Sequence, residues 1–355
     1  SGKALRGAML SATDLSNADT AEQLIQLAEA GKLNTVIVNI KDDEGELNIP
    51  VETDMVSDVE DLQAKKAEKL AQNIRKLSKN GVHVVGRVYC FQDEAASKQN
   101  SDLSMAYQNG GRWSDYNGEH WLDPTNPDVV TYLCDIAQSA VDAGCDEILL
   151  DEFSFPLRGH IDRIEFFNEP DSQAAALLDV MQEIQNTVGD SVSVSLTASD
   201  ASELIAQSET AAEDGVKLGS VKKLLTTAHR VYVPVGSDDA KSVIDSVQKI
   251  APKAQVVPIF TRMTDWTEYT EDAVVNAVDA TEAAIAVFGG DKTAKSYDGA
   301  GETTSRRSTS SSRSSYDSDT EEDEEDDEEY DSNDSSSSDY DAEEDDSDSY
   351  SDEDE

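Results

Sequence analysis

Histidine and cysteine, the residues that build most zinc and redox sites, are scarce here, with four histidines and three cysteines among 355 residues. The histidines are dispersed, and the chain has no CxxC pair and no Cys/His cluster. We therefore expect no metal and no other cofactor, which disfavours metal-dependent deacetylases and phosphatases. The three cysteines cannot all pair with one another. Each lies in an apolar or periodic stretch, which is typical of a buried thiol.

Long apolar runs and basic residues are scarce as well. No apolar stretch reaches the ~18 residues of a membrane-spanning helix, so we expect no direct membrane insertion. The chain has 75 acidic against 28 basic residues and a net charge of −47. Residues 301–355 hold 25 acids and three arginines, so the first 300 residues are strongly acidic too. Such a surface repels DNA, RNA and anionic lipid, and we expect no nucleic acid among the partners.

Composition divides the chain into two parts. From about Thr303 onward it consists largely of Ser, Asp, Glu and Tyr, and Glu321 to Glu329 are nine consecutive acids. Such a segment buries too little apolar area to offset its chain entropy. We therefore expect a folded domain over residues 1–297 and a disordered acidic tail over 298–355. The tail is expected to act as a solubilising spacer, with weak calcium binding or phosphorylation as the alternative.

Short apolar, β-branched runs alternate with helical patterns through the first 300 residues. Eight strands with intervening helices match a closed (β/α)₈ barrel of the TIM type better than an open doubly wound sheet. No GxGxxG or GxxxxGK[ST] motif follows a strand, so the phosphate cradle of the dinucleotide and P-loop folds is missing. The predicted strands are residues 5–10, 35–40, 82–89, 147–150, 192–196, 230–235, 255–260 and 284–288.

The ends of several helices can be read from capping residues. Thr20 and Gln23 have the spacing of a capping box, and Gly31 ends that helix. Asn126 is a predicted N-cap with Pro127 in the first position. Further helices are predicted over residues 58–80, 127–143, 172–188, 219–228, 239–250 and 270–282.

The connections 91–125 and 152–170 are long, and both follow a predicted strand. Several helix-to-strand connections, in contrast, are only a glycine and a few residues. In this fold the loops at the carboxyl ends of the strands form the active face. Catalytic carboxyl groups are therefore expected at the strand ends.

Glycoside hydrolysis requires two positioned carboxyl groups. Asp151 ends the apolar run 147–150, where an acid is costly to bury without a partner or a role. Glu152 follows it, Asp93 follows the third strand, and Asp42 follows the second. Acids at loop starts are expected by chance in so acidic a chain, and Lys41 is an equally plausible ion-pair partner for Asp42.

Aromatic residues gather in the connection 91–125, with polar side chains between them. Flat aromatic faces beside hydrogen-bonding groups suit sugar rings. The alternative is that the tryptophans pack this loop onto the barrel. The aromatic residues are Tyr107, Trp113, Tyr116 and Trp121, and the polar ones are Asp115, Asn117 and Asp123.

Three motifs follow one another in order: "LNTVIVNIKDDEGELNI", "GVHVVGRVYCFQDEAAS" and "WSDYNGEHWLDPTNPDVVTYLCDIAQSAVDAGCDEILLDEFSFP". Together they resemble a bacterial family of glycoside hydrolase-like TIM barrels, with the pattern KDD, FKD, WxDP and FDYxRFP. The match is strong from about Gly7 to Pro156. The resemblance implies a TIM barrel with a hydrolase-like site. By position, it assigns functional roles to Lys41, Asp42, Asp43, Arg87, Asp93, Trp121, Asp123 and Asp151.

From the residues and the resemblance together we expect a site at one barrel mouth. The expected catalytic carboxyl groups are those of Asp151, Glu152, Asp93 and Asp42. The expected substrate contacts are Lys41, Asp43, Arg87, Tyr89, Trp113, Trp121 and Asp123.

The chain also departs from the family pattern. Glu152 and Ser154 stand where the family has Tyr and Arg, and the fifth and seventh strands lack the expected acids. Two hypotheses follow: a hydrolase of a polysaccharide, or an inactive barrel that binds a glycan or serves in surface display. Both imply an extracellular or cell-surface protein. Because the chain begins at Ser1 rather than Met, we expect that a signal or anchor is absent from it.

Overall fold

The computed structural model describes residues 5–57, 61–198, 219, 221–236, 240–263 and 284–288. These residues include all eight predicted strands. The predicted helix at 270–282, the domain boundary at 297 and the predicted tail at 298–355 lie outside the described residues.

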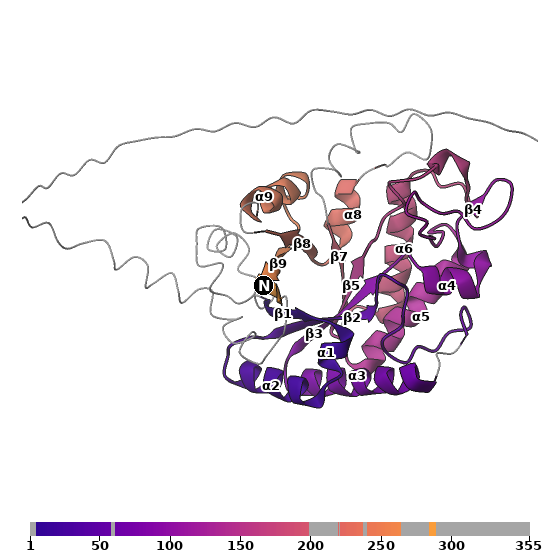
Figure 1. The fold of residues 1–355 in the computed structure, drawn as a ribbon. Helices are drawn as coiled ribbons and strands as arrows, with labels where there is room; N and C mark the ends of the chain where they lie inside the picture. The colour runs from indigo at the N-terminus through magenta and orange to yellow at the C-terminus, as the bar shows by residue number, and fades with distance from the viewer. Residues whose placement is uncertain are drawn as a thin grey trace, which may run out of the picture. The chain divides into compact units, whose positions relative to one another are not determined.

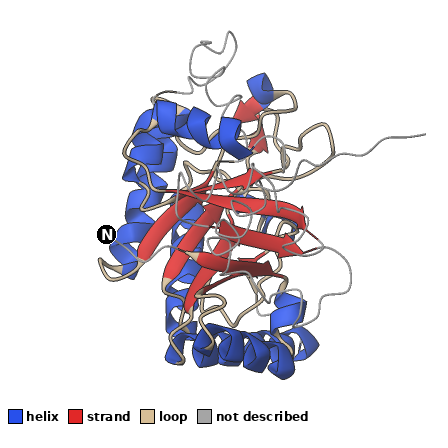
Figure 2. Cartoon of the chain, turned by 90° about the vertical axis from the view of Figure 1, so that its left-hand side faces the viewer, coloured by secondary structure: helices blue, strands red, loops and turns tan. Residues whose placement is uncertain are grey.

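Eight parallel strands close into a barrel in the order β1-β10-β9-β8-β7-β5-β3-β2 (Figures 1 and 2). Closure comes from the pairing of β1 with β10, where Gly7 lies opposite Ile285. All eight predicted strands are confirmed, with ends that differ by at most three residues. The strands are β1 (Arg6–Leu10), β2 (Thr35–Lys41), β3 (His83–Tyr89), β5 (Glu147–Asp151), β7 (Ser193–Thr197), β8 (Val231–Val235), β9 (Val256–Met263) and β10 (Ala284–Phe288).

Helices surround the strands (Figure 1). The Asn126 side chain accepts from the Asp128 backbone N–H, and Gly144 ends that helix at φ +110°, as predicted. The predicted cap at Thr20 is wrong, because Asn17 caps the helix three residues earlier through the backbone N–H of Asp19. The helices are α1 (Ala12–Leu15), α2 (Ala18–Glu29), α3 (Asp61–Lys79), α4 (Glu94–Gln99), α5 (Pro127–Ala143), α6 (Gln173–Val188), α8 (Val221–Thr227) and α9 (Ala240–Ile250).

The two long connections fold against each other at the carboxyl end of the barrel. A short antiparallel pair joins β4 (Ala106–Tyr107) to β6 (Ile164–Glu165). Two turns of 3₁₀ helix, Ser101–Leu103 and Ile161–Arg163, flank this pair. The two long loops therefore contain hydrogen-bonded secondary structure beside the barrel mouth.

Side chains that point into the barrel form layers. The middle layer is apolar and includes Met9, Ile37, Val85 and Leu149, all buried. Because side chains alternate along a strand, Glu147 and Asp151 share the inward face of β5 with Leu149. Ile148 and Leu150 belong to the separate apolar layer between strands and helices. One strand thus carries a carboxylate at each end of the barrel interior.

At the amino end of the strands, Glu147 is the centre of a buried polar network. Its carboxylate accepts from Ser195 Oγ at 2.5 Å, from Arg230 at 2.5 Å and from the Tyr232 hydroxyl at 3.1 Å. His83 Nε2 lies 2.8 Å from the same carboxylate. Burial alone would raise the pKa of Glu147, but the His83 and Ser195 hydrogen bonds and the Arg230 charge outweigh it and lower that pKa. We call these five residues the floor network.

Cys90, Cys134 and Cys145 are all free; Cys90 and Cys145 are buried as predicted, whereas Cys134 is only half-buried. Burial raises the pKa of both buried thiols. Among the described helices, none has the length and apolar character needed to cross a bilayer. The described residues also contain no group of three or more His, Cys, Asp or Glu side chains arranged to hold a metal ion.

Candidate active site at the barrel mouth

The carboxyl ends of the parallel strands bring the predicted acids to one face of the barrel. Asp42 follows β2, Asp93 follows β3, and Asp151 is the last residue of β5. Direct pairing of Tyr89 with Asp151 fixes the relative height of β3 and β5. The prediction that these three acids share one mouth is confirmed.

Asp151 is held by Arg87, whose side chain comes from the neighbouring strand β3. Two guanidinium nitrogens, Nε and a terminal one, contact Asp151 Oδ2. The backbone N–H of Glu152 donates to Asp151 Oδ1 at 2.8 Å. Arg87 also lies 4.5 Å above the Tyr89 ring, a cation–π contact. The guanidinium thus serves as the counter-charge of Asp151, and its predicted contact with a substrate stays a prediction.

Glu152 has a backbone conformation that residues with a side chain rarely adopt. Its φ is +44°, and it is the one non-glycine with positive φ among the described residues. Such a conformation costs roughly 1–3 kcal/mol and persists where the surroundings enforce it. Burial raises the pKa of its half-buried carboxyl, and the neighbouring Asp151 carboxylate raises it further, while Arg87 and Arg158 oppose both. Glu152 therefore retains its proton to a higher pH than an ordinary glutamate.

Five side chains form one electrostatic group, which we call the mouth cluster: Asp43, Arg87, Tyr89, Asp151 and Glu152. Burial raises the pKa of Tyr89 to about 12, with the Asp151, Asp43 and Glu152 carboxylates acting in the same direction and Arg87 opposing. The Tyr89 hydroxyl is therefore a hydrogen-bond donor at neutral pH. The cluster offers a proton donor, a carboxylate and a phenol at one strand end.

Two buried oxygen atoms near the carboxyl ends of separate strands have no hydrogen-bond partner within the described residues: Asn39 Oδ1 in β2 and Thr197 Oγ1 in β7. Buried polar atoms are normally satisfied by protein, water or ligand. Asn39 pairs directly with Arg87 across the β2–β3 ladder. The interior face at this end of the barrel therefore has unused hydrogen-bonding capacity.

The structure corrects the expectation for Lys41 and Asp93. The two side chains form an ion pair of 2.8 Å in which both are 0% exposed. Lys41 Nζ also donates to the Tyr89 carbonyl at 2.6 Å, and Asp93 Oδ1 accepts from the Ala96 N–H as the cap of α4. Burial raises the pKa of Asp93, and Lys41 opposes this shift. Neither side chain reaches a substrate from this position; the pair joins α4 to the barrel.

The two acids after Lys41 differ in what they do. Asp42 Oδ1 accepts from the backbone N–H groups of Glu44 and Glu46, at 3.1 and 2.9 Å, and so shapes its own loop. The alternative interpretation, an ion pair of Asp42 with Lys41, is not found, because Lys41 pairs with Asp93. Asp43 is exposed and influences both Tyr89 and Glu152.

The predicted sugar contacts in the long loop also need correction. Trp113 is fully buried and donates to the His160 carbonyl at 3.0 Å, and Trp121 is 5% exposed. Asp123 is buried, and its carboxylate accepts from Thr125 and from the Phe167 N–H. Burial raises the pKa of Asp123. These residues pack the loop onto the barrel, which was the alternative interpretation.

Other aromatic residues on these loops are open to solvent. Tyr116 is 69% exposed and Phe167 is 62% exposed. The Tyr116 ring meets the His160 ring edge to face at 5.6 Å. Tyr116 stands between Asp115 and Gly118 in a polar turn, a local signal of exposure that the tryptophans lack. The sequence around Phe167 contains no comparable signal of solvent exposure.

Comparison with known proteins supports a carbohydrate-active barrel. Residues 7–219, more than half of the chain, match the model of a family described as "Putative glycosyl hydrolase domain". Among the curated proteins, none matches this chain.

Three solved structures illustrate the structural likeness. The glycoside hydrolase domain of PgaB (BpsB) from Bordetella bronchiseptica is 13% identical with a TM-score of 0.54, and the match covers 81% of this chain and 94% of that one. The GH36 alpha-galactosidase AgaB from Geobacillus stearothermophilus is 11% identical with a TM-score of 0.54, covering 86% and 42%. A hypothetical protein from Ruminiclostridium thermocellum is 26% identical with a TM-score of 0.44, covering 53% and 96%.

At such low identity the first two structures speak for the fold alone, a barrel shared with glycoside hydrolases. The family match rests on the sequence, and it spans β1 to β7 with Arg87, Asp151 and Glu152. The chain belongs to this family of glycosyl hydrolase domains.

Proposed function

We propose that this protein hydrolyses a polysaccharide, with Glu152 as the general acid and Asp151 as the second carboxyl group. The observation that carries the proposal is the contrast between these two neighbours at one strand end. Asp151 contacts a guanidinium, whereas burial and the Asp151 charge raise the pKa of Glu152. Glycoside hydrolysis uses one carboxyl group that holds a proton and a second that acts as base or nucleophile, and these two neighbours match that division of roles.

The conformation of Glu152 supports this pairing. In a regular strand residue 152 would point to the opposite side of the sheet from Asp151. The positive φ interrupts that alternation, and Glu152 remains under the influence of Asp151, Arg87 and Asp43. Asp93 is fully buried and Asp42 bonds within its own loop, so neither competes as the second group.

Replacing Glu152 by Gln tests the assignment of the acid. The amide cannot donate a proton to the glycosidic oxygen, so hydrolysis of a natural polysaccharide should fall about 10²–10⁴-fold. An aryl glycoside whose leaving group needs no protonation should lose much less. Reducing-end release from a polysaccharide panel, compared with release of nitrophenol, measures both. Equal losses on the two substrate types would contradict an acid role for Glu152.

We propose Tyr116 as a sugar-stacking residue in place of the buried tryptophans. Replacing it by Ala removes an exposed aromatic face, and we expect about a 5- to 20-fold rise in KM with little change in kcat. Trp113→Phe is the control, because this buried ring cannot contact a ligand from its position. An unchanged KM for Tyr116→Ala would remove Tyr116 from the site.

A binding module is the second candidate, and one observation favours it. Thr197 ends β7 at a position where the family pattern has an aspartate, and its hydroxyl has no partner in the described part of the chain. If the wild-type protein binds a glycan yet cleaves none across a broad panel at pH 4 to 8, a range that brackets carboxyl titration, the binding module is correct. Both candidate functions, hydrolase and binding module, imply a location outside the cell, and we propose that location as well.

A further inference from the structure

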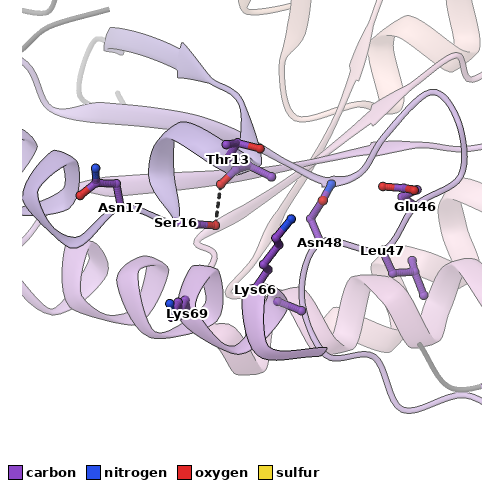
Figure 3. Close-up of a pocket in the computed structure, with 10 residues that line it drawn as sticks. Thr13, Ser16, Asn17, Glu46, Leu47, Asn48, Lys66 and Lys69 are labelled. Atoms are coloured by element: carbon purple, nitrogen blue, oxygen red, sulfur yellow. Dashed lines mark hydrogen bonds between the residues drawn. The ribbon is translucent and has the colours of Figure 1, made fainter. Parts of the chain in front are cut away.

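A second pocket opens beside the barrel mouth, outside the mouth cluster. Its cavity of about 610 Å³ lies between α1, the loop after β2 and α3 (Figure 3). That volume is within the ~300–1,000 Å³ of small-molecule sites. Four of the side chains that line it are central to what it can bind: Thr13, Asn48, Lys66 and Lys69. We call it the lysine pocket.

The lysine pocket and the mouth cluster share one loop. The segment that carries Asp42 and Asp43 continues through Glu46, Leu47 and Asn48, which line the pocket. Asp42 Oδ1 accepts from the Glu46 N–H at 2.9 Å, and Asn48 N–H donates to the Ile40 carbonyl at 2.8 Å. One braced segment therefore carries residues of both the mouth cluster and the pocket.

The pocket wall that α1 and α3 form is also held in place by packing and hydrogen bonding. Asn73 in α3 is buried, and its side-chain amide donates to the Leu15 carbonyl of α1 at 2.7 Å. Ala67 and Leu70 of α3 are buried beneath the pocket side of the helix. The pocket is therefore formed by packed elements and does not require an ordering step before it binds.

Charge distinguishes this pocket from the acidic protein around it. Lys66 and Lys69 are three residues apart and so are neighbours on α3, where like charges repel slightly. Both are exposed, and neither has an ion-pair partner among the described residues, whereas Lys76 of the same helix pairs with Glu22 at 2.5 Å. Glu46 is the one acid in the pocket lining, which leaves a local excess of positive charge. An anion bound in the pocket would therefore meet ammonium groups that have no other counter-charge among the described residues.

Neutral hydrogen-bonding groups complete the set. Ser16 Oγ is committed to the Ala12 carbonyl, and Asn17 caps α2. The Thr13 and Asn48 side chains have no hydrogen-bond partner within the described residues and remain available to hydroxyl groups. In Figure 3 Lys66 lies between Ser16 and Asn48, with Thr13 across the pocket. Ammonium groups for an anion next to neutral donors and acceptors fit a sugar that carries a negative substituent.

We propose that the lysine pocket is a subsite for an anionic sugar unit of the polysaccharide. The negative substituent, a uronate carboxylate or an ester sulfate, would lie near Lys66 and Lys69. This inference rests on the proposed function, because it concerns the next units of the same substrate. The Asp43 and Asp151 carboxylates disfavour an anion at the mouth, so we expect a neutral unit there and a heteropolysaccharide as the substrate. At a Debye length of about 8 Å in physiological salt, the two lysines dominate over more distant acids.

The test is calorimetric binding of three chondroitin hexasaccharides to protein that carries Asp151→Asn, so that no ligand is cleaved. The probes are the unsulfated form, its carboxyl-reduced form, and a carboxyl-reduced form with an ester sulfate. We expect at least one charged probe to bind about tenfold more tightly than the neutral one. Lys66→Gln with Lys69→Gln should abolish that preference, since two charge-assisted contacts are lost.

Lys65→Gln with Lys79→Gln is the matched control, because it removes the same charge from exposed positions of α3 outside the pocket. The control should keep the preference within twofold. Preference for the carboxylate probe identifies a uronate subsite, and preference for the sulfate probe identifies a sulfate subsite. Equal affinity for all three probes, or an equal loss of the preference in both double variants, would overturn the proposal. Hydrolysis by the wild type is measured separately, so a failure of the subsite and a failure of the proposed hydrolase are distinguishable.

Discussion

Asparagine at position 151 is expected to reduce polysaccharide hydrolysis by about 10²–10⁴-fold while the barrel stays folded. The amide retains the size of the carboxylate and can still accept the Glu152 N–H, which now donates at 2.8 Å. It cannot act as a base or a nucleophile, and it cannot stabilise developing positive charge at the anomeric carbon. Initial rates of reducing-end release, together with far-ultraviolet circular dichroism, measure the two effects.

Asp43→Asn is the matched control, because it removes one charge from an exposed member of the mouth cluster. Its rate should stay within about tenfold of the wild type, since a neighbouring exposed charge acts mainly through screened electrostatics. Binding of an uncleaved glycan should also remain within about tenfold in Asp151→Asn. Equal rate losses in the two variants would show that net charge at the mouth matters, and not the Asp151 carboxylate itself.

The second large effect is expected at the other end of the same strand. Glu147→Gln should lower the free energy of unfolding by about 3–5 kcal/mol, because it leaves the buried Arg230 guanidinium without its counter-charge. Arg230 Nε already has no hydrogen-bond partner within the described residues, so Arg230 has little else to compensate it. Urea unfolding followed by tryptophan fluorescence measures this change.

Glu22→Gln is the control for the same change of charge at the surface. The Lys76–Glu22 pair is about half exposed, and its loss should cost less than about 1 kcal/mol. Similar destabilisation of both variants would contradict a special role for the floor network.

The pH dependence of the free energy of unfolding is an independent test of the role of Glu147. Folding lowers the pKa of Glu147, so its contribution is complete above the ordinary glutamate pKa of about 4.3 and is lost as the pH falls through the folded value. The stability difference between the wild type and Glu147→Gln should therefore shrink as the pH falls below about 4. A difference that grows with acidification would show that the carboxyl is protonated in the folded state.

Local patterns were enough to predict the barrel. Apolar, β-branched runs predicted every strand of the barrel but not the short strands β4 and β6, and the Asn126–Pro127 cap and Gly144 gave both ends of α5. These features depend on residues that are close in sequence. The cap at Thr20 was wrong because Asn17 offers the same chemistry one turn earlier, and spacing alone does not rank the two.

The site was harder to predict, because the role of each residue depends on partners that are far away in the sequence. Lys41 and Asp93 are 52 positions apart, and no local signal favours that pair over Lys41 with Asp42. Trp113 is an equally good sugar platform or core residue until the loop around His160 is seen to cover it. Glu147 was one of many acids at strand ends, and only the convergence of Arg230, Ser195 and His83 sets it apart.

The two carboxylates of β5 also limit how that strand can align with its neighbours. A shift of one residue against β3 would turn Glu147 and Asp151 outward among the helices and place Ile148 and Leu150 beside Arg87 and Arg230. A shift of two residues towards the mouth would place Glu147 where Leu149 now lies, in the apolar layer of Met9 and Ile37 and away from Arg230. Because each end has its own arginine, from β3 at the mouth and from the start of β8 at the floor, both errors leave buried charges unpaired. The two carboxylate–arginine pairs thus help to select a single alignment of the barrel during folding.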